Sequence, residues 1–307
     1  MVAAAAERAE CAVCGFVSRP RGADPQASMA RHVADRARAG CAAHGVAWVR
    51  PQAKRRRAAG PAQLRWRASR PIPRHRNVAR LALDAAVLAC VRAEFEAMAP
   101  RKKDDREGLD LSARSDLFAA GRRFAVVQPA WGKSDIRWVS ARDKSTLAYF
   151  SGLFSELRIA ELAAPFLGAD PAASWVMLAG YFVARQLVRK AHFHTDFSGT
   201  AAKAFTLMTP LHDMAALPDS CNLLCKTPGG LRRYRYVVGE AVIFGDDFVH
   251  ATEPGDAGQP VAFLSFTFGS KKMTSEEWQC AEYYIAQQCP IYRDPAGKIK
   301  YEDAVAR

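Results

Sequence analysis

The seven short segments that follow Pro171 constrain the fold more than any other feature of the sequence. They are rich in Val, Phe, Tyr and Thr, and Gly, Pro and Asp separate them, which is typical of β-strands joined by turns. Short strands in such numbers bury their apolar faces only against each other, so they predict an antiparallel sandwich or barrel. The expected strands are 175–183, 189–196, 204–209, 221–225, 234–238, 241–244 and 261–268.

Helices are expected before and after these strands in the sequence. Apolar residues recur at spacings of three or four over 78–98 and again over 143–168, which is the period of a helix with one buried face. Another helix should begin near Ser275, because Thr274 and Glu277 have the spacing of a capping box. The fold class predicted is mainly β with flanking helices.

Composition limits the class of protein. Of the 307 residues, 50% are apolar and 24% are charged, which is enough apolar material for a large core and excludes disorder throughout. The sequence shows neither an apolar stretch of the roughly 18 residues that span a membrane nor the pattern of a secretory signal. We therefore expect an intracellular protein, cytoplasmic or nuclear, with reduced cysteines and no membrane partner.

The net charge of +13 lies entirely in the first 80 residues, which hold 17 Lys and Arg against 4 Asp and Glu, whereas the rest holds 27 of each sign. Residues 50–77 are predicted to be a basic linker rich in Pro and Arg. Eleven cations and no carboxylate lie within 50–80, so this stretch should repel itself into an extended form. Two interpretations are open: a solvated linker, or a nuclear-import signal or nucleic-acid contact in which Trp66 stacks on a base.

A group of cysteines and histidines in residues 1–49 suggests a small separate module. Cys11 and Cys14 form a CxxC turn, and His32 and His44 follow, with Cys41 nearby. The order resembles the opening of a zinc-finger module, in which two thiolates and two ligands from a helix bind Zn²⁺. Because no second ligand follows His32 at the usual spacing, unligated thiols on a helical hairpin are the alternative.

Two histidines and one aspartate stand out among the expected strands. His194 and Asp196 are two positions apart, so in a strand they face the same side. His250 follows the apolar segment Gly-Glu-Ala-Val-Ile-Phe. Two histidines and a carboxylate form a facial triad that suits Fe(II) and leaves positions open for a bidentate cosubstrate and dioxygen. The pattern predicts a catalytic iron site at His194, Asp196 and His250.

Residues 194–268 resemble the double-stranded β-helix core of the Fe(II)/2-oxoglutarate-dependent oxygenases. The segment GEAVIFGDDFVHATEP, which contains His250, is similar to its counterpart in the prolyl hydroxylase and aspartyl/asparaginyl hydroxylase branches. The resemblance implies an oxygenase domain over 78–307 with a β-helix core over about 175–270. It also implies Fe(II) and 2-oxoglutarate as cofactors and a dioxygenase, or hydroxylase, reaction. A protein side chain, a nucleic acid and a small metabolite all remain open as substrate.

One expected residue of the family is missing. The family carries an Arg or Lys about ten residues after the distal histidine, where it binds the far carboxylate of 2-oxoglutarate. Gln259 and Pro260 occupy that place, and residues 251–270 contain no basic residue. Because a buried carboxylate needs a charge partner, we expect another residue to bind it. Lys203 is the first candidate by position, Arg185 and Lys226 come next, and Thr206 or Ser265 could add a hydroxyl contact.

Two other interpretations use the same residues. His192 and His194 begin a cupin-like motif, although the Glu expected a few residues later is missing. Independently of that motif, His192 shares the inward side with His194, so it is a further ligand, a supporting hydrogen-bond donor or an ordinary strand residue. The second interpretation is a non-catalytic nucleic-acid-binding protein whose barrel has lost its cosubstrate. Substitution of His194 or Asp196 separates it from the enzyme, because only turnover would be lost.

Overall fold

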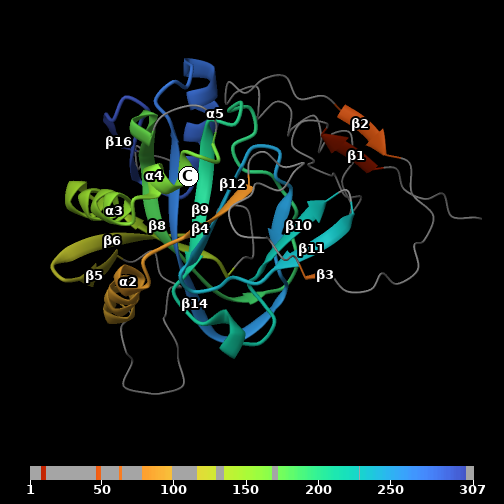
Figure 1. Ribbon diagram of the computed structural model, residues 1–307, viewed down its shortest axis with the longest axis horizontal. Coiled ribbons are helices and arrows are strands. Elements are labelled where there is room, and N and C mark those ends of the chain that lie inside the picture. Colours follow the sequence, from red (N-terminus) through yellow and green to blue (C-terminus); the bar gives the residue numbers. More distant parts are fainter. Residues whose placement is uncertain are drawn as a thin grey trace, which may run out of the picture.

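The larger of two facing sheets has eight antiparallel strands in the order β4-β12-β9-β14-β8-β7-β6-β5 (Figure 1). This computed structural model describes residues 8–11, 46–49, 62–63, 78–98, 116–128, 135–167, 172–227 and 229–301. The strands of the larger sheet are β4 (Val78–Ala82), β5 (Asp116–Ala119), β6 (Arg122–Val127), β7 (Arg137–Ala141), β8 (Trp175–Val188), β9 (Ala204–Pro210), β12 (Glu240–Gly245) and β14 (Gly255–Ser270).

The smaller sheet has the order β13-β10-β11-β3, and His194 adds an isolated bridge to β13. From β8 to β14 the chain crosses repeatedly between the two sheets and stays in the smaller one only for the hairpin β10-β11. This is the strand order of a double-stranded β-helix, and the fold prediction is confirmed. Two further strand pairs are β1-β2 and β15-β16. The remaining strands are β1 (Arg8–Cys11), β2 (Val46–Val49), β3 (Ala62–Gln63), β10 (Leu223–Thr227), β11 (Gly230–Tyr234), β13 (His250–Thr252), β15 (Ile291–Arg293) and β16 (Ile299–Tyr301).

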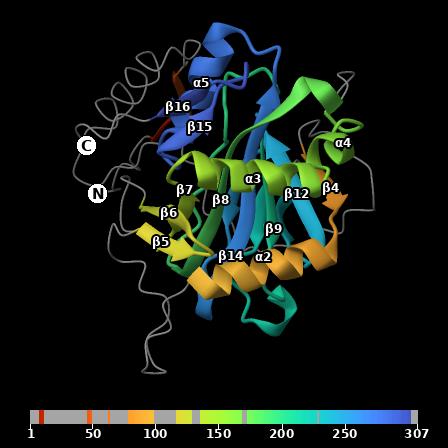
Figure 2. The same ribbon diagram turned by 90° about the vertical axis from the view of Figure 1, so that its left-hand side faces the viewer.

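Helices α2 (Ala85–Met98), α3 (Lys144–Glu156) and α4 (Ile159–Ala163) pack on the larger sheet on the side away from the smaller one; α2 and α3 lie across its face in Figure 2. Asp143 caps α3 by accepting from the Thr146 amide, which satisfies a free N–H of the first turn. Helix α3 approaches β8 so closely that a Cβ on Gly180 would lie 2.4 Å from Cβ of Phe150. Two 3-10 turns, η1 (Ala172–Ser174) and η2 (Met214–Ala216), and helix α5 (Ser275–Ile285) complete the elements.

The two faces of β8 belong to different cores. Phe182 and Ala184 pack with the helices, whereas Tyr181 and Val183 pack between the sheets. This alternation follows from the two-residue period of a strand. Arg185 comes next on the same side as Tyr181 and Val183, so its side chain starts from the inner face of the barrel.

Several expected elements differ from the observed ones. The helix predicted over 78–98 begins only at Ala85, because residues 78–82 pair with β12 as strand β4. The strand predicted over 189–196 is reduced to the bridge at His194. The expected strand 234–238 forms earlier, as β11. Strands β5, β6 and β7 were not predicted. Helix α5 has the expected capping box of Thr274 and Glu277.

The N-terminal predictions fall largely outside the described residues. Cys14, His32 and His44 are outside the described residues, and Cys11 is the last residue of β1. The zinc site therefore stays a prediction. Residues 50–77 are described only at β3, which runs parallel to β11 beside Arg232 and Arg233. Within the described ranges, no helix is long and apolar enough to cross a membrane.

Candidate metal centre

His194, Asp196 and His250 lie together at the edge of the smaller sheet. Their potential ligand atoms all lie within 4.8 Å of one another. Nε2 of His194 is 3.5 Å from Oδ1 of Asp196, and Nε2 of His250 is 3.8 Å from Oδ2. The three residues expected from the sequence therefore form one cluster, and His192 is not part of it.

The two histidines are held in the same tautomer. Nδ1 of His194 lies 2.8 Å from the carbonyl oxygen of His192, and Nδ1 of His250 lies 2.9 Å from that of Phe248. A carbonyl oxygen only accepts hydrogen bonds, so each Nδ1 carries the proton and donates. Each Nε2 then presents a lone pair toward Asp196, as a metal-binding histidine does.

His250 is the buried member of the cluster, with 6% of its surface exposed. Its ring packs against two phenylalanine rings that also contact each other: Phe244, at 4.5 Å between centroids, and Phe248, stacked on it at 5.6 Å. Burial, with a further contribution from the nearby His194, lowers the pKa of His250 to about 4. The imidazole is therefore neutral at neutral pH, which is the state that binds a metal. The side chain of His194, in contrast, is half exposed and borders solvent.

Asp196 is oriented by the larger sheet. Thr206, on the inner face of β9, donates from its hydroxyl to Oδ2 of Asp196 at 3.2 Å. The sequence placed Thr206 and Ser265 at the cosubstrate. The structure places Thr206 behind the carboxylate, whereas buried Ser265 donates to the Leu207 carbonyl at 2.9 Å. Supporting contacts of the Thr206 type fix the direction of a ligand oxygen.

The cluster offers two imidazole nitrogens and one carboxylate within 4.8 Å of one another. This donor set fits Fe(II) in a facial triad, in which the opposite positions stay open. The histidine tautomers and the support of Asp196 agree with the same assignment, because each ligand has its lone pair toward the centre. The described residues therefore suit a mononuclear iron site.

The basic residues considered from the sequence are in different situations. Nζ of Lys203 lies 2.8 Å and 2.9 Å from the carboxylate oxygens of Glu277 in α5, so it already has a charge partner. Nζ of Lys226 lies over the ring of Phe193, 4.9 Å from its centroid. Arg185 contacts Thr252 of β13. Of these three side chains, that of Arg185 contacts the strand that carries His250.

Sequence reasoning missed two side chains beside the cluster. Phe244 and Phe248 hold the ring of His250, and both stand in the segment that had been singled out for His250 itself. Tyr236, a buried residue of the inner core, gave no signal at all. It lies between β11 and β12, and only the packing of the barrel brings its ring against Phe263 of β14.

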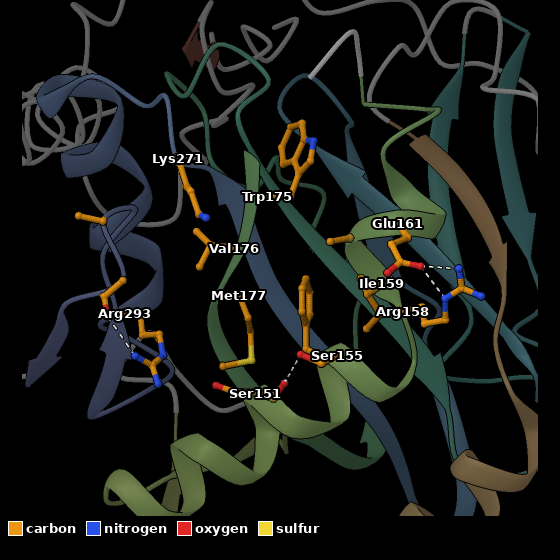
Figure 3. Close-up of a pocket in the computed structure, with 14 residues that line it drawn as sticks. Ser151, Ser155, Arg158, Ile159, Glu161, Trp175, Val176, Met177, Lys271 and Arg293 are labelled. Carbon is orange, nitrogen blue, oxygen red and sulfur yellow. Dashed lines mark hydrogen bonds and ion pairs between the residues drawn. The ribbon is translucent and has the colours of Figure 1, made fainter. Parts of the chain in front are cut away.

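A cavity of about 510 Å³ lies on the other side of β8 and is separate from the metal cluster (Figure 3). Trp175 and Met177 of β8 line it together with Ser155 of α3. Trp175 and Met177 belong to the core under the helices rather than to the barrel interior. Arg158 and Glu161, at its rim, pair with each other. The barrel interior, and not this cavity, holds the candidate site.

No family model and no curated protein matches the sequence. Among solved structures, the chain is similar to the non-heme alpha ketoglutarate dependent epimerase SnoN from nogalamycin biosynthesis, with 15% identity, 64% of this chain and 80% of that chain covered, and a TM-score of 0.44. It is also similar to an oxidoreductase of the 2OG-Fe(II) oxygenase family from Burkholderia pseudomallei, with 13% identity, coverage of 68% and 96%, and a TM-score of 0.42.

A third similar structure is HygX from Streptomyces hygroscopicus with nickel and 2-oxoglutarate bound, with 12% identity, coverage of 66% and 85%, and a TM-score of 0.44. These likenesses are distant, since all three TM-scores are below 0.5. Fold and site therefore rest on the strand order and side-chain geometry of this chain. What the other proteins bind is a property of those proteins.

Proposed function

We propose that the protein is a mononuclear non-haem Fe(II) dioxygenase that couples decarboxylation of 2-oxoglutarate to hydroxylation of a substrate. The observation that carries this proposal is the convergence of Nε2 of His194, Nε2 of His250 and the Asp196 carboxylate within 4.8 Å. Bound Fe(II) and 2-oxoglutarate would supply the oxidation of a C–H bond by dioxygen.

The residues around the triad have distinct tasks in this proposal. Thr206 holds the Asp196 carboxylate in place, and the carbonyls of His192 and Phe248 keep both Nε2 atoms unprotonated. Phe244 and Phe248 shield the buried ligand His250 from water. His194 is the exposed ligand, so the substrate would approach from its side.

The test is an anaerobic titration of metal-free protein with Fe(II), with and without 2-oxoglutarate. Calorimetry reports iron binding, and the visible charge-transfer band of an iron-chelated keto acid reports the cosubstrate. We expect one iron per chain and a band that Asp196→Ala abolishes. Asp256→Ala, which changes an exposed aspartate of β14, is the matched control and should retain both. Absence of iron binding in the wild type would contradict the proposal.

Hydroxylation itself is tested once a substrate is found. Under labelled dioxygen, the product should gain one oxygen atom that carries the label, and one 2-oxoglutarate should be consumed per product. An epimerised or desaturated product without added oxygen would retain the iron site and 2-oxoglutarate while contradicting the hydroxylase assignment.

A further inference from the structure

We propose that Arg185 and Tyr236 bind the far carboxylate of 2-oxoglutarate, in place of the basic residue that β14 lacks. This inference rests on the proposed function, because it concerns the cosubstrate of the same site. It replaces Lys203, whose ammonium group is paired with Glu277. It also predicts that the site discriminates between keto acids with one and two carboxylates.

The strand register brings Arg185 to the missing position. Residue 259 on β14 is exposed, whereas Val261 is completely buried and packs between the sheets. Val261 pairs with Arg185 on the neighbouring antiparallel strand β8. Residues directly opposite each other in such a pair project to the same face. Arg185 therefore points into the barrel from the strand next to the one that should have carried the cation.

Arg185 also lies close to the metal ligands. Its guanidinium donates to the hydroxyl of Thr252, which is two residues after His250 on β13. The β10 partners of His250 and Thr252 are Cys225 and Leu223, and both belong to the inner core. Two residues along a strand span about 6.6 Å, which is similar to the length of a five-carbon dicarboxylate. One end of such a molecule could reach the metal while its other end reaches Arg185.

Among the described residues, the charge of Arg185 has no carboxylate as a partner. Its buried Nε has no hydrogen-bond partner among these residues either. Arg233 of the smaller sheet, in contrast, pairs with both Asp219 and Glu253. A cation inside a barrel is costly when unpaired, and a guanidinium matches the two oxygens of a carboxylate. A ligand carboxylate would satisfy both conditions.

Tyr236 supplies a second donor on the inner side of the barrel, because it packs on Phe263, whose partner on β8 is Val183, two residues before Arg185. Its side chain is buried, its ring packs on Phe263 of β14 at 4.9 Å, and its hydroxyl contacts the sulfur of Met208 at 3.8 Å. A thioether is a weak acceptor, so a carboxylate would be a better partner for this hydroxyl. Burial raises the pKa of Tyr236, while the charge of Arg185 lowers it and that of Asp196 raises it. The hydroxyl is thus a protonated donor within the fields of both residues.

The experiment compares two keto acids on the Fe(II)-loaded protein under anaerobic conditions. One is 2-oxoglutarate, and the other is 2-oxopentanoate, which has the same chain length but lacks the far carboxylate. Dissociation constants are taken from the charge-transfer band. Removal of one partner of a buried charge pair typically changes affinity by about a hundredfold or more. We therefore expect the wild type to bind 2-oxoglutarate about a hundredfold more tightly than 2-oxopentanoate.

The substitution Arg185→Gln should bring this ratio close to one, with affinities for Fe(II) and 2-oxopentanoate unchanged. Tyr236→Phe should lower the ratio about tenfold, because it removes one hydrogen bond to a charged group. Lys203→Met, the matched control, should leave the ratio as in the wild type. If Arg185→Gln does not fold, Arg185→Lys decides instead: a lower ratio is expected, since a single ammonium cannot make two parallel hydrogen bonds.

The two proposals fail in different ways. A ratio that survives Arg185→Gln or falls in Lys203→Met overturns the assignment of Arg185, while the iron site stands. If the wild type binds both keto acids to iron with nearly equal affinity, the assignment of Arg185 is likewise overturned and the iron site stands. Failure of the wild type to bind Fe(II), or to form the band with either keto acid, overturns the proposed function and this inference with it.

Discussion

His194 and His250 are joined through their backbones: the N–H of each donates to the carbonyl oxygen of the other at 2.9 Å, and their rings lie 4.4 Å apart. The two residues are far apart in sequence, so this bridge alone sets the spacing of the two imidazoles. With the two backbones paired, Nε2 of His194 lies 3.5 Å and Nε2 of His250 lies 3.8 Å from the carboxylate oxygens of Asp196. The spacing of the two histidines is thus a property of the smaller sheet, whereas Thr206 of the larger sheet orients Asp196.

Phe248→Ala should weaken both the fold and metal binding. The substitution removes the ring stacked on His250 and leaves a cavity, which costs about 3–5 kcal/mol of unfolding free energy. Phe154→Ala is the matched control, because Phe154 is buried among the helices against Phe266. Urea unfolding should show similar losses in both variants, and Fe(II) titration should show weaker binding only in Phe248→Ala. Equal iron affinities would contradict the role given to Phe248.

Thr206→Val should lower Fe(II) affinity about 10–100-fold, the usual effect of losing a group that orients a metal ligand. The reason is that valine lacks the hydroxyl that donates a hydrogen bond to the Asp196 carboxylate at 3.2 Å. The control is Thr209→Val on the same strand, which removes a hydroxyl that donates its hydrogen bond to the backbone carbonyl of Glu240 instead. Calorimetric titration should find the iron affinity of this second variant unchanged. The idea fails if both substitutions have the same effect on iron binding.

Ionisation of the Asp246 carboxyl should lower the free energy of unfolding as the pH rises. Burial, with a contribution from Asp247, raises the pKa of its carboxyl to about 6. Because the folded-state pKa lies above the unfolded one, the stabilising effect is present below the unfolded pKa near 4 and is lost as pH rises through 6. Asp246→Asn should therefore add about 1 kcal/mol of unfolding free energy at pH 8, after allowance for partial exposure. Urea unfolding at pH 4 should show no gain; the same gain at both pH values would exclude this cause.

Gly180→Ala should destabilise the protein, whereas Gly152→Ala should not. A Cβ on Gly180 meets Phe150 at 2.4 Å, but one on Gly152 has nothing within 4 Å. Overpacking of this kind costs about 1–3 kcal/mol, while alanine in place of glycine inside a helix gains up to about 1 kcal/mol. Thermal unfolding should move in opposite directions for the two variants. A stable Gly180→Ala protein would show that α3 can shift away from β8.

The basic segment 50–80 is proposed to contact nucleic acid. Its eleven cations without a carboxylate should give binding to a single-stranded oligonucleotide that weakens steeply with salt. Replacing 54–57 with serines should reduce the slope of log affinity against log salt by about 3, at roughly 0.7 for each lost phosphate contact. Asp196→Ala should leave this binding unchanged. A slope that does not respond to the serines would favour the solvated linker.

The sequence by itself determined the class of the fold and the members of the candidate triad. Enrichment in Val, Phe, Tyr and Thr between turn residues predicted β9, β12 and half of β14, because such residues favour an extended backbone. The start of α5 followed from Thr274 and Glu277, since a capping box is satisfied within four residues. Both signals are local, so no other part of the chain is needed to interpret them.

Tertiary structure decided the pairings. Residues 78–82 fit a helical period, yet they form a strand because the edge of β12 satisfies their backbone. Lys203 was chosen by its place in the sequence, but Glu277 of α5 pairs with it. Arg185 faces the barrel opposite Val261 only because of the register between β8 and β14, which shifts between Asp256 and Val261. A local pattern records which face is buried, whereas the partner across the sheet depends on distant backbone hydrogen bonds.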